Sequence, residues 1–337
     1  MARTLEEVAE RAGVSRSTAS RVINNHPNVS ATTRARVKAA IEKCGYRPHA
    51  VARSLATNRT NILGMVIPEA VTKLFTDPYF PLMLRGATEA CNRNGYQLIL
   101  SLFTASVDPA TMHDRVVRSG YLDGVLVANA SLDDGLIPRL LGDGIPFITI
   151  GRHPEDRVNY VDVDNVGGAR MAVEHLIRLG HKRIGTITGP LDMTPGQDRL
   201  DGFRNVMNTH RLPVTEGLVA EGDFTEAGGR AAMVRLLREA PTAVFAASDS
   251  MAIGAIKAIR AADLRVPEDI SVIGFDDVPS AVMIEPELTT VRQPIERLGQ
   301  LAVEILVNLI EEEAENGTTQ RIVLPTELVV RESCGSR

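Results

Sequence analysis

The segment TLEEVAERAGVSRSTASRVINN (Thr4–Asn25) contains two short helical patterns joined by a glycine turn. Thr4 and Glu7 have the spacing of a capping box at the start of the first pattern. Apolar residues then recur at i, i+3, i+4 and i+7 from Leu5, which places them on one face of a helix. Gly13 provides a left-handed residue at which that helix ends. The segment therefore predicts a helix-turn-helix unit.

The second helix of this unit presents a polar, basic face. Its inward positions are Ala19, Val22 and Ile23. Its outward positions, at i, i+4 and i+7, are Ser17, Arg21 and Asn24. Ser15 is placed to cap this helix, and Arg16 lies in its first turn, where a recognition helix directs side chains to base edges. Because arginine can donate two hydrogen bonds to guanine, we expect Arg16 and Arg21 to read bases in DNA.

The charge of the chain is divided unequally along its length. A third helix is predicted between Ser30 and Gly45, and its Arg34, Arg36 and Lys38 are expected to contact phosphates or only solvent. Residues 1–60 carry 11 basic and 4 acidic residues, a net charge of +7, whereas residues 61–337 carry 26 and 38, a net charge of −12. This division predicts a small polyanion-binding module on an acidic body.

The segment YRPHAVARSLATNRT (46–60) has a proline, a short helical pattern and then polar residues. A helix of this length is marginal in water, so it would be ordered only against a partner. Leucine can part base steps from the minor groove, and Leu55, with Ala52 and Ala56 beside it, suits that role. The alternative is a linker between domains in which Leu55 packs on the body.

Residues 4–60 resemble the headpiece and hinge of the LacI/GalR family of transcriptional repressors. The resemblance implies that Arg16, Ser17 and Arg21 read the major groove of an operator and that Leu55 intercalates at its central step. The full set of expected DNA contacts is Thr4, Ser15, Arg16, Ser17, Thr18, Ser20, Arg21, Asn24, Ala52, Leu55 and Ala56. His49 departs from the family, which usually has asparagine there, and this leaves the local hinge contact in doubt.

The body alternates between apolar runs and helical stretches, as parallel strands buried on both faces require. The runs are 62–67, 97–102, 124–129 and 147–151, and then 183–188, 218–221, 243–247 and 271–275. A helix at 295–315 and a strand at 321–329 are expected to cross back, with crossings near Tyr160, Val291 and Leu324. The pattern predicts an α/β core of two doubly wound parallel-sheet subdomains, and it resembles the periplasmic sugar-binding fold.

The expected domains follow from these patterns. They are an all-α helix-turn-helix headpiece (1–47), a hinge helix and linker (48–60), a first core subdomain (61–160 with 293–323) and a second (161–291 with 324–331).

Enzyme, cofactor and metal signatures are absent from the sequence. The first strand of the body leads into MVIPEA without a G-x-G-x-x-G turn, and there is neither a phosphate-binding P-loop nor a G-x-S-x-G elbow. The 7 histidines and 3 cysteines are scattered. The chain shows no apolar signal core and no apolar stretch of membrane-spanning length. We therefore expect a cytoplasmic protein that is not an enzyme and needs no cofactor or metal.

Ligands of such cores bind beyond the carboxyl ends of the strands, between the two halves. A carboxylate and a guanidinium can bracket adjacent sugar hydroxyls, while aromatic rings cover the C–H surface. The resemblance implies that Arg199 and Asp276 grip effector hydroxyls and that other contacts lie at family positions. The expected effector contacts are Phe80, Arg152, Asp164, Arg199, Phe224, Asp249 and Asp276. Asp164 and Asp249 can instead cap the helices that follow them.

These observations together predict a dimeric repressor whose affinity for a near-palindromic operator is controlled by a small-molecule effector. The effector is expected to be a monosaccharide or oligosaccharide. A dimer is expected because the sequence leaves no room for a leucine heptad tail. Two alternatives stay open, a nucleobase-like corepressor bound by the same architecture and a solute-binding protein without DNA binding.

Overall fold

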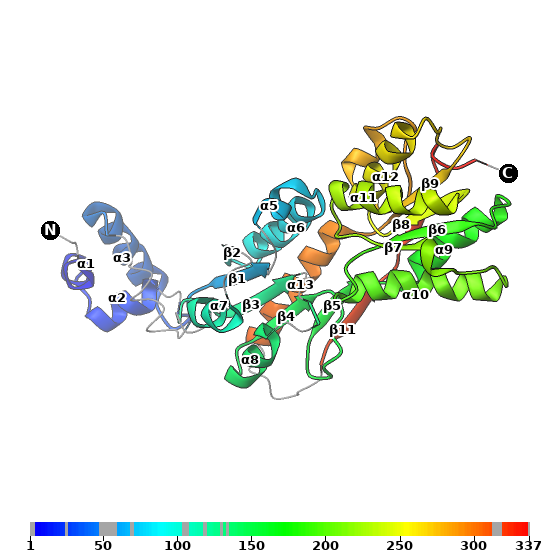
Figure 1. Cartoon of the computed structure of the whole chain (residues 1–337). Helices are drawn as coiled ribbons and strands as arrows, with labels where there is room; N and C mark the ends of the chain where they lie inside the picture. The colour runs from blue at the N-terminus through cyan, green and yellow to red at the C-terminus, as the bar shows by residue number, and fades with distance from the viewer. Residues whose placement is uncertain are drawn as a thin grey trace. The chain divides into compact units, whose positions relative to one another are not determined.

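The computed structural model divides into two compact units, Met1–Thr60 and Asn61–Arg337 (Figure 1). The structure describes residues 4–23, 26–46, 59–67, 71–102, 108–116, 120–128, 131–132, 135–311 and 319–335. The predicted hinge helix, with His49, Ala52, Leu55 and Ala56, lies outside the described residues, as does Asn24.

The first unit contains the helices α1 (Leu5–Ala12), α2 (Arg16–Ile23) and α3 (Ala31–Cys44). The Thr4 side chain accepts a hydrogen bond from the Glu7 backbone N–H, as the capping box predicts. Gly13, with φ of 62°, ends α1 in the left-handed conformation. Val8, Ala19 and Val37 are fully buried where the three helices meet. Local caps and one small apolar cluster thus define the helix-turn-helix unit.

The second unit is built on two sheets. The first has the order β11-β5-β4-β3-β1-β2, and the second has the order β12-β10-β9-β8-β6-β7. The strands of the first are β1 (Ile62–Ile67), β2 (Gln97–Leu102), β3 (Gly124–Ala128), β4 (Phe147–Ile150), β5 (Tyr160–Val163) and β11 (Arg321–Leu324). Those of the second are β6 (Ile184–Thr188), β7 (Val219–Glu221), β8 (Ala243–Ala246), β9 (Ser271–Asp276), β10 (Thr289–Arg292) and β12 (Glu327–Val329). All paired strands are parallel except β10 and β12, so the α/β prediction of two parallel-sheet subdomains is confirmed.

The chain crosses between the two sheets three times, between β5 and α9, between β10 and α13, and between β11 and β12. The first crossing follows Val163, not Tyr160, because β5 pairs with β4 and β11 of the first sheet. The single strand predicted at 321–329 is two strands, since Leu324 ends a strand of the first sheet and Glu327 begins one of the second. The first subdomain therefore extends through Val163 and Leu324, slightly beyond the predicted boundaries.

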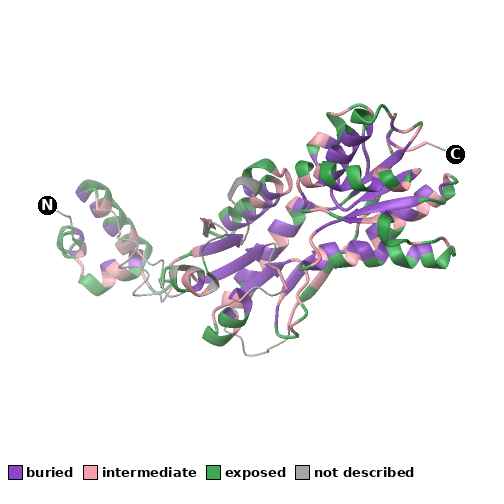
Figure 2. Cartoon of the chain, viewed as in Figure 1, coloured by how far each residue is buried: buried purple, intermediate pink, exposed green. Residues whose placement is uncertain are grey.

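Helices cover both faces of each sheet, and the strands between them are buried (Figures 1 and 2). The first sheet packs against α5 (Val71–Thr76), α6 (Tyr79–Arg93) and α13 (Ile295–Glu311) on one face and against α8 (Leu136–Asp143), with α7 (Pro109–Val116) beside it, on the other. The second sheet packs against α9 (Asn165–Arg178) and α10 (Thr194–Thr209) on one face and α11 (Glu226–Leu236) and α12 (Asp249–Ala261) on the other. Short 3₁₀ turns lie at Glu216–Leu218, Leu237–Glu239 and Pro279–Val282.

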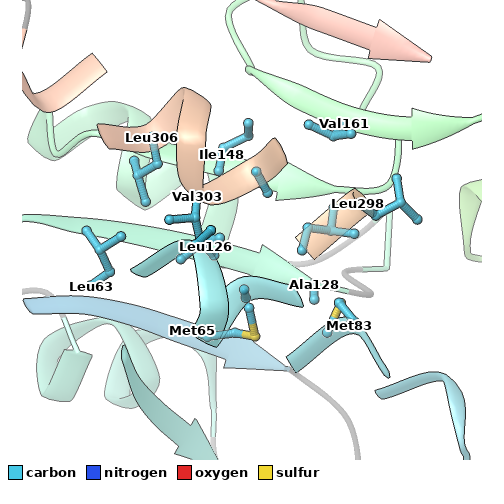
Figure 3. Packing of buried hydrophobic residues seen from close by; sticks show 14 of the residues in the cluster. Leu63, Met65, Met83, Leu126, Ala128, Ile148, Val161, Leu298, Val303 and Leu306 are labelled. Atoms are coloured by element: carbon cyan, nitrogen blue, oxygen red, sulfur yellow. The ribbon is translucent and has the colours of Figure 1, made fainter. Parts of the chain in front are cut away.

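Helix α13 is the central packing element of the first subdomain. Its Leu298, Val303 and Leu306 lie over strand residues such as Leu126 and Ile148 (Figure 3). The helix also approaches α6 closely, because glycines stand at the contact. A Cβ atom at Gly299 would lie 2.2 Å from the Met83 carbonyl oxygen, and one at Gly86 would lie 2.0 Å from that of Glu296. Neither position has room for a side chain.

We expect Gly86→Ala and Gly299→Ala each to destabilise the protein by about 1–3 kcal/mol, because the added methyl group meets backbone atoms that can move only with the helix. The midpoint of urea unfolding measures this loss. Gly142→Ala is the matched control, since Gly142 is exposed within α8 and a Cβ there meets nothing within 4 Å. That control should be neutral or stabilising, because alanine favours helix over glycine. Equal midpoints for all three variants would contradict the close packing of α6 on α13.

Candidate functional site

The exposed face of α2 carries the side chains that the sequence predicts to read DNA. Arg16, Ser17 and Arg21 are all exposed, whereas Thr18 and Ser20 are half-buried. The Ser15 hydroxyl lies 3.2 Å from the backbone N–H of Thr18, from which it accepts, and 2.9 Å from the Ser17 hydroxyl. Ser15 therefore caps the helix and orients its first turn. The described part of the face is an array of arginine and hydroxyl donors suited to phosphates and base edges.

Arg16 is held by a neighbour on the preceding helix. Its Nε lies 2.7 Å from Oε1 of Glu6, and 70% and 59% of the two side chains are exposed. Exposed ion pairs of this kind contribute little to stability, so DNA can displace Glu6 at small cost. Thr4 is exposed, and its hydroxyl caps α1.

Arg36 has a structural contact that the sequence did not reveal. Its Nη2 donates to the carbonyl oxygens of Ala12 and Gly13, at 2.7 Å and 2.9 Å. Arg36 thus satisfies the carboxyl end of α1 and ties α3 to the turn. Arg36 therefore does not meet only solvent, whereas a contact with phosphates stays a prediction.

A second site lies in the other unit, in a cavity between its two subdomains at the carboxyl ends of the strands. The cavity encloses about 870 Å³, with its open mouth included. Five of the seven predicted effector contacts line it, namely Phe80, Arg152, Arg199, Phe224 and Asp276. Their part in binding an effector stays a prediction.

Arg199 is the buried cation of this cavity. Its Nε donates to Oδ1 of Asn165 at 2.9 Å, and its Nη1 donates to the carbonyl oxygen of Ala247 at 2.5 Å. The guanidinium also lies 3.7 Å from the centre of the Phe275 ring. An arginine has five N–H donors, so these two bonds fix its orientation and leave donors for a ligand.

Asp276 is the buried carboxylate partner of Arg199. Its Oδ1 lies 3.6 Å from Nη1 of Arg199 and accepts a hydrogen bond of 2.5 Å from Nε2 of Gln293. The backbone of Asp276 has φ of 120°, a conformation that non-glycine residues rarely adopt. Burial raises the pKa of Asp276 to about 7, despite the opposing charge of Arg199. The pair can donate to one hydroxyl of a ligand and accept from the next.

Aromatic rings form the apolar part of the lining. Phe80 packs edge to face on Tyr79, with 5.5 Å between ring centres. Phe224, with φ of 64°, lies so close to Gly189 that a Cβ there would be 2.1 Å from the ring. Arg199 lies 6.0 Å from the centre of the Phe224 ring. Charged groups and flat apolar surface therefore occur side by side.

Arg152 connects the subdomains. Its Nη2 lies 2.7 Å from Oδ1 of Asp198 on α10, and its carbonyl oxygen accepts from the Thr194 hydroxyl at 2.8 Å. The backbone N–H of Leu132 donates to the Asp192 carbonyl oxygen at 2.8 Å. These bonds hold the two halves together at one edge of the cavity.

The structure does not bring Asp164 or Asp249 to the cavity lining, which corrects the sequence prediction for both. Asp164 caps α9, with Oδ1 2.7 Å from the Gly167 N–H. Asp249 is fully buried in the first turn of α12 and accepts from the Val278 N–H at 2.9 Å and from the Thr290 hydroxyl at 2.5 Å. Both carboxylates are used by the fold, but only Asp164 caps a helix as the alternative predicts. The cap of α12 is Ser248, whose hydroxyl accepts from the Met251 N–H at 3.2 Å.

The predicted effector contacts do not include several residues that line the cavity. Among these are Asp162, Asn165, Ser248 and Gln293. Ser248 directly precedes Asp249, so the residue that lines the cavity at this strand end lies one position before the predicted one. Asp162 accepts from the backbone N–H of Arg152 at 3.0 Å and from Nδ2 of Asn165 at 3.0 Å. The position of Asp162 and Asn165 at the first crossing was the available signal, but the contact of Asn165 with Arg199, 34 residues later, forms only in the folded chain.

Within the ranges that the structure describes, no group of three or more His, Cys, Asp or Glu side chains is arranged to hold a metal ion. No helix among the same residues combines the length and apolar character needed to cross a membrane.

Known proteins are similar to both units of the chain. The family "Bacterial regulatory proteins, lacI family" matches residues 4–49, and "Periplasmic binding protein-like domain" matches residues 173–334. The HTH-type transcriptional regulator CelR of Thermobifida fusca is 43% identical over 341 residues, which cover 98% of each chain.

Two solved structures match nearly the full length of the chain. A transcriptional regulator CelR–cellobiose complex is 41% identical, with a TM-score of 0.77 and coverage of 98% of this chain and 99% of that one. A lac repressor dimer bound to operator and the anti-inducer ONPF is 28% identical, with a TM-score of 0.85 and full coverage of both chains. The chain belongs to the lacI family of bacterial regulatory proteins, and it is a DNA-binding transcriptional regulator rather than an enzyme.

Proposed function

We propose that the chain is a cytoplasmic repressor that binds a near-palindromic operator as a homodimer, and that a neutral sugar of the cellobiose class controls its operator affinity. The observation that carries the sugar proposal is the buried Arg199–Asp276 pair beside aromatic rings in the cavity. The similarity to CelR, which is seen in complex with cellobiose, supports this ligand class. The lac repressor dimer on its operator supports the homodimer.

The cavity chemistry favours an uncharged polyhydroxylated ligand. Asp77, Asp162 and Asp276 line it together with Arg152 and Arg199. Arg152 is paired with Asp198, so its charge is already compensated. A phosphorylated ligand would bring further negative charge to three carboxyl groups, whereas hydroxyls can donate to the carboxylates and accept from Arg199. A nucleobase would need stacking and edge recognition instead, and a thermal-shift comparison of sugars with bases separates the two classes.

Control of DNA binding follows from linkage between the two units. An effector can shift operator affinity only if it binds one arrangement of the core more tightly than another. Cavity residues come from both subdomains and from their crossings, so a bound sugar contacts both halves at once. The predicted hinge, at residues 48–60, joins this core to the headpiece.

Arg16→Ala should weaken binding to the operator by about 1–3 kcal/mol and relax the preference at one base pair, because a bidentate contact to guanine is lost. Fluorescence anisotropy with the operator and with base-pair variants measures both effects. Glu6→Gln is the control, since it removes only the partner of Arg16 in the free protein. It should leave the affinity unchanged or slightly higher. Unaltered operator affinity and specificity in Arg16→Ala would show that Arg16 does not read bases.

Arg199→Lys should weaken cellobiose binding at least about tenfold, because lysine cannot reproduce the planar donor array. Titration calorimetry measures the loss, and operator binding without sugar reports whether the variant is folded. Arg204→Ala, an exposed arginine on the same helix that is not part of the cavity lining, should bind cellobiose normally. Normal binding by folded Arg199→Lys would remove Arg199 from the site.

The affinity for cellobiose should fall as the pH is lowered through about 7. Burial raises the pKa of Asp276 to about 7, so the carboxyl keeps its proton below that pH. Because sugar hydroxyls donate to the ionised form, binding below this pH releases a proton. The dissociation constant should rise by up to about tenfold per pH unit below about 7 and stay constant above it.

Calorimetry over this pH range measures the dependence, and Asp276→Asn should bind weakly with no such dependence. If the wild-type dissociation constant is the same at about pH 6 and about pH 8, the ligand does not depend on ionised Asp276.

A further inference from the structure

A second hollow adjoins the effector cavity and has no role in the proposed function. It encloses about 810 Å³, with its open mouth included, and both subdomains line it. Thr76 ends α5, and Asp77 and Pro78 connect it to α6, whereas Thr225, Glu226 and Ala227 come from the start of α11. Asp77 and Phe224 line both hollows, so these two residues stand between neighbouring spaces. We call the second hollow the outer groove.

The residues that the two hollows share are held in place by the backbone. The Tyr79 N–H donates to Oδ1 of Asp77 at 3.1 Å. Phe224 is 8% exposed, its backbone has a positive φ, and its ring packs closely against Gly189. A rigid ring between two hollows offers apolar surface to a ligand in each of them.

The remaining lining of the outer groove is polar but carries little positive charge. Ser250, Ser280 and Thr225 contribute hydroxyl-bearing side chains, and Ile253 contributes apolar surface. The charged residues of the lining are Asp77 and Glu226, and Oε1 of Glu226 lies 2.5 Å from Nζ of Lys257. Hydroxyls, a carboxylate and apolar patches are the groups that proteins use to bind neutral sugars. Phosphate or sulfate groups would find no unpaired cation among the lining residues that the structure describes.

We infer that the outer groove is a second subsite, which binds the additional unit of a neutral oligosaccharide whose first units occupy the effector cavity. This inference rests on the proposed function, because it requires that a sugar bind in the cavity. It adds that the protein distinguishes its effectors by chain length. A third sugar unit would leave the cavity past Phe224 and Asp77 and lie between α11 and the α5–α6 connection.

A chain-length series tests this subsite. Titration calorimetry of the full-length protein with glucose, cellobiose and cellotriose should show cellotriose binding about tenfold more tightly than cellobiose. Ala227→Trp fills the outer groove from an exposed position in the first turn of α11. It should abolish this gain and leave cellobiose binding unchanged. Ala231→Trp is the matched control, because Ala231 is exposed one helical turn later and does not line the groove.

Each result of these titrations either supports or overturns the subsite. Loss of the gain in Ala227→Trp but not in Ala231→Trp supports the subsite. If cellobiose binds and cellotriose binds no more tightly to the wild type, the subsite is wrong and the proposed function stands. A gain that persists in Ala227→Trp places the third unit elsewhere and also overturns the subsite. If none of the three sugars binds, the proposed sugar effector is itself wrong, and the subsite falls with it.

Discussion

The burial of the Arg199 guanidinium between the two halves of the core determines how the effector cavity is organised. Burial lowers the pKa of Arg199, and nearby carboxylates oppose this effect. A buried cation is tolerated only when it is paired and hydrogen-bonded. Asp276, Asn165 and the Ala247 carbonyl oxygen meet this need, together with the Phe275 ring. Residues from several separate elements must therefore converge on one side chain.

This convergence runs through the crossings between subdomains. Asp162 and Asn165 lie on either side of the first crossing, and Gln293 lies in the second. Hydrogen bonds connect Arg152 to Asp162, Asp162 to Asn165 and Asn165 to Arg199, and Gln293 donates to Asp276. A ligand that changes the partners of Arg199 or Asp276 acts on the segments about which the two halves would move. A pocket built at these crossings is thus suited to control the arrangement of the core.

Local signals allowed much of the fold to be predicted from the sequence. The capping box at Thr4 and Glu7, the left-handed Gly13 and the apolar runs of the core each depend on neighbours in sequence. The exact crossings were less accessible, because the pairing of β5 with β11 joins residues 160 and 321. The same holds for Arg36, which caps a helix 24 residues away.

The residues of the candidate site could likewise be predicted from the sequence only in part. Arg199 and Asp276 were predicted from the family resemblance, and Asp276 also from its position at the end of a strand. Asp249 was assigned to the cavity because it follows a buried strand, but its carboxylate turns toward Thr290 and Val278, on segments that follow later in the chain. Ser248, its neighbour, lines the cavity instead. A shift of one residue decides which side chain faces the cavity, and the packing of α12 against the sheet sets that position.

The coupling between the cavity and the headpiece can be measured by titrating operator DNA with the full-length protein at zero and at saturating cellobiose. We expect the operator dissociation constant to change by about 5–150-fold, in either direction, and operator DNA to change the cellobiose affinity by the same factor. Identical operator affinity with and without bound cellobiose would show that the sugar does not control DNA binding.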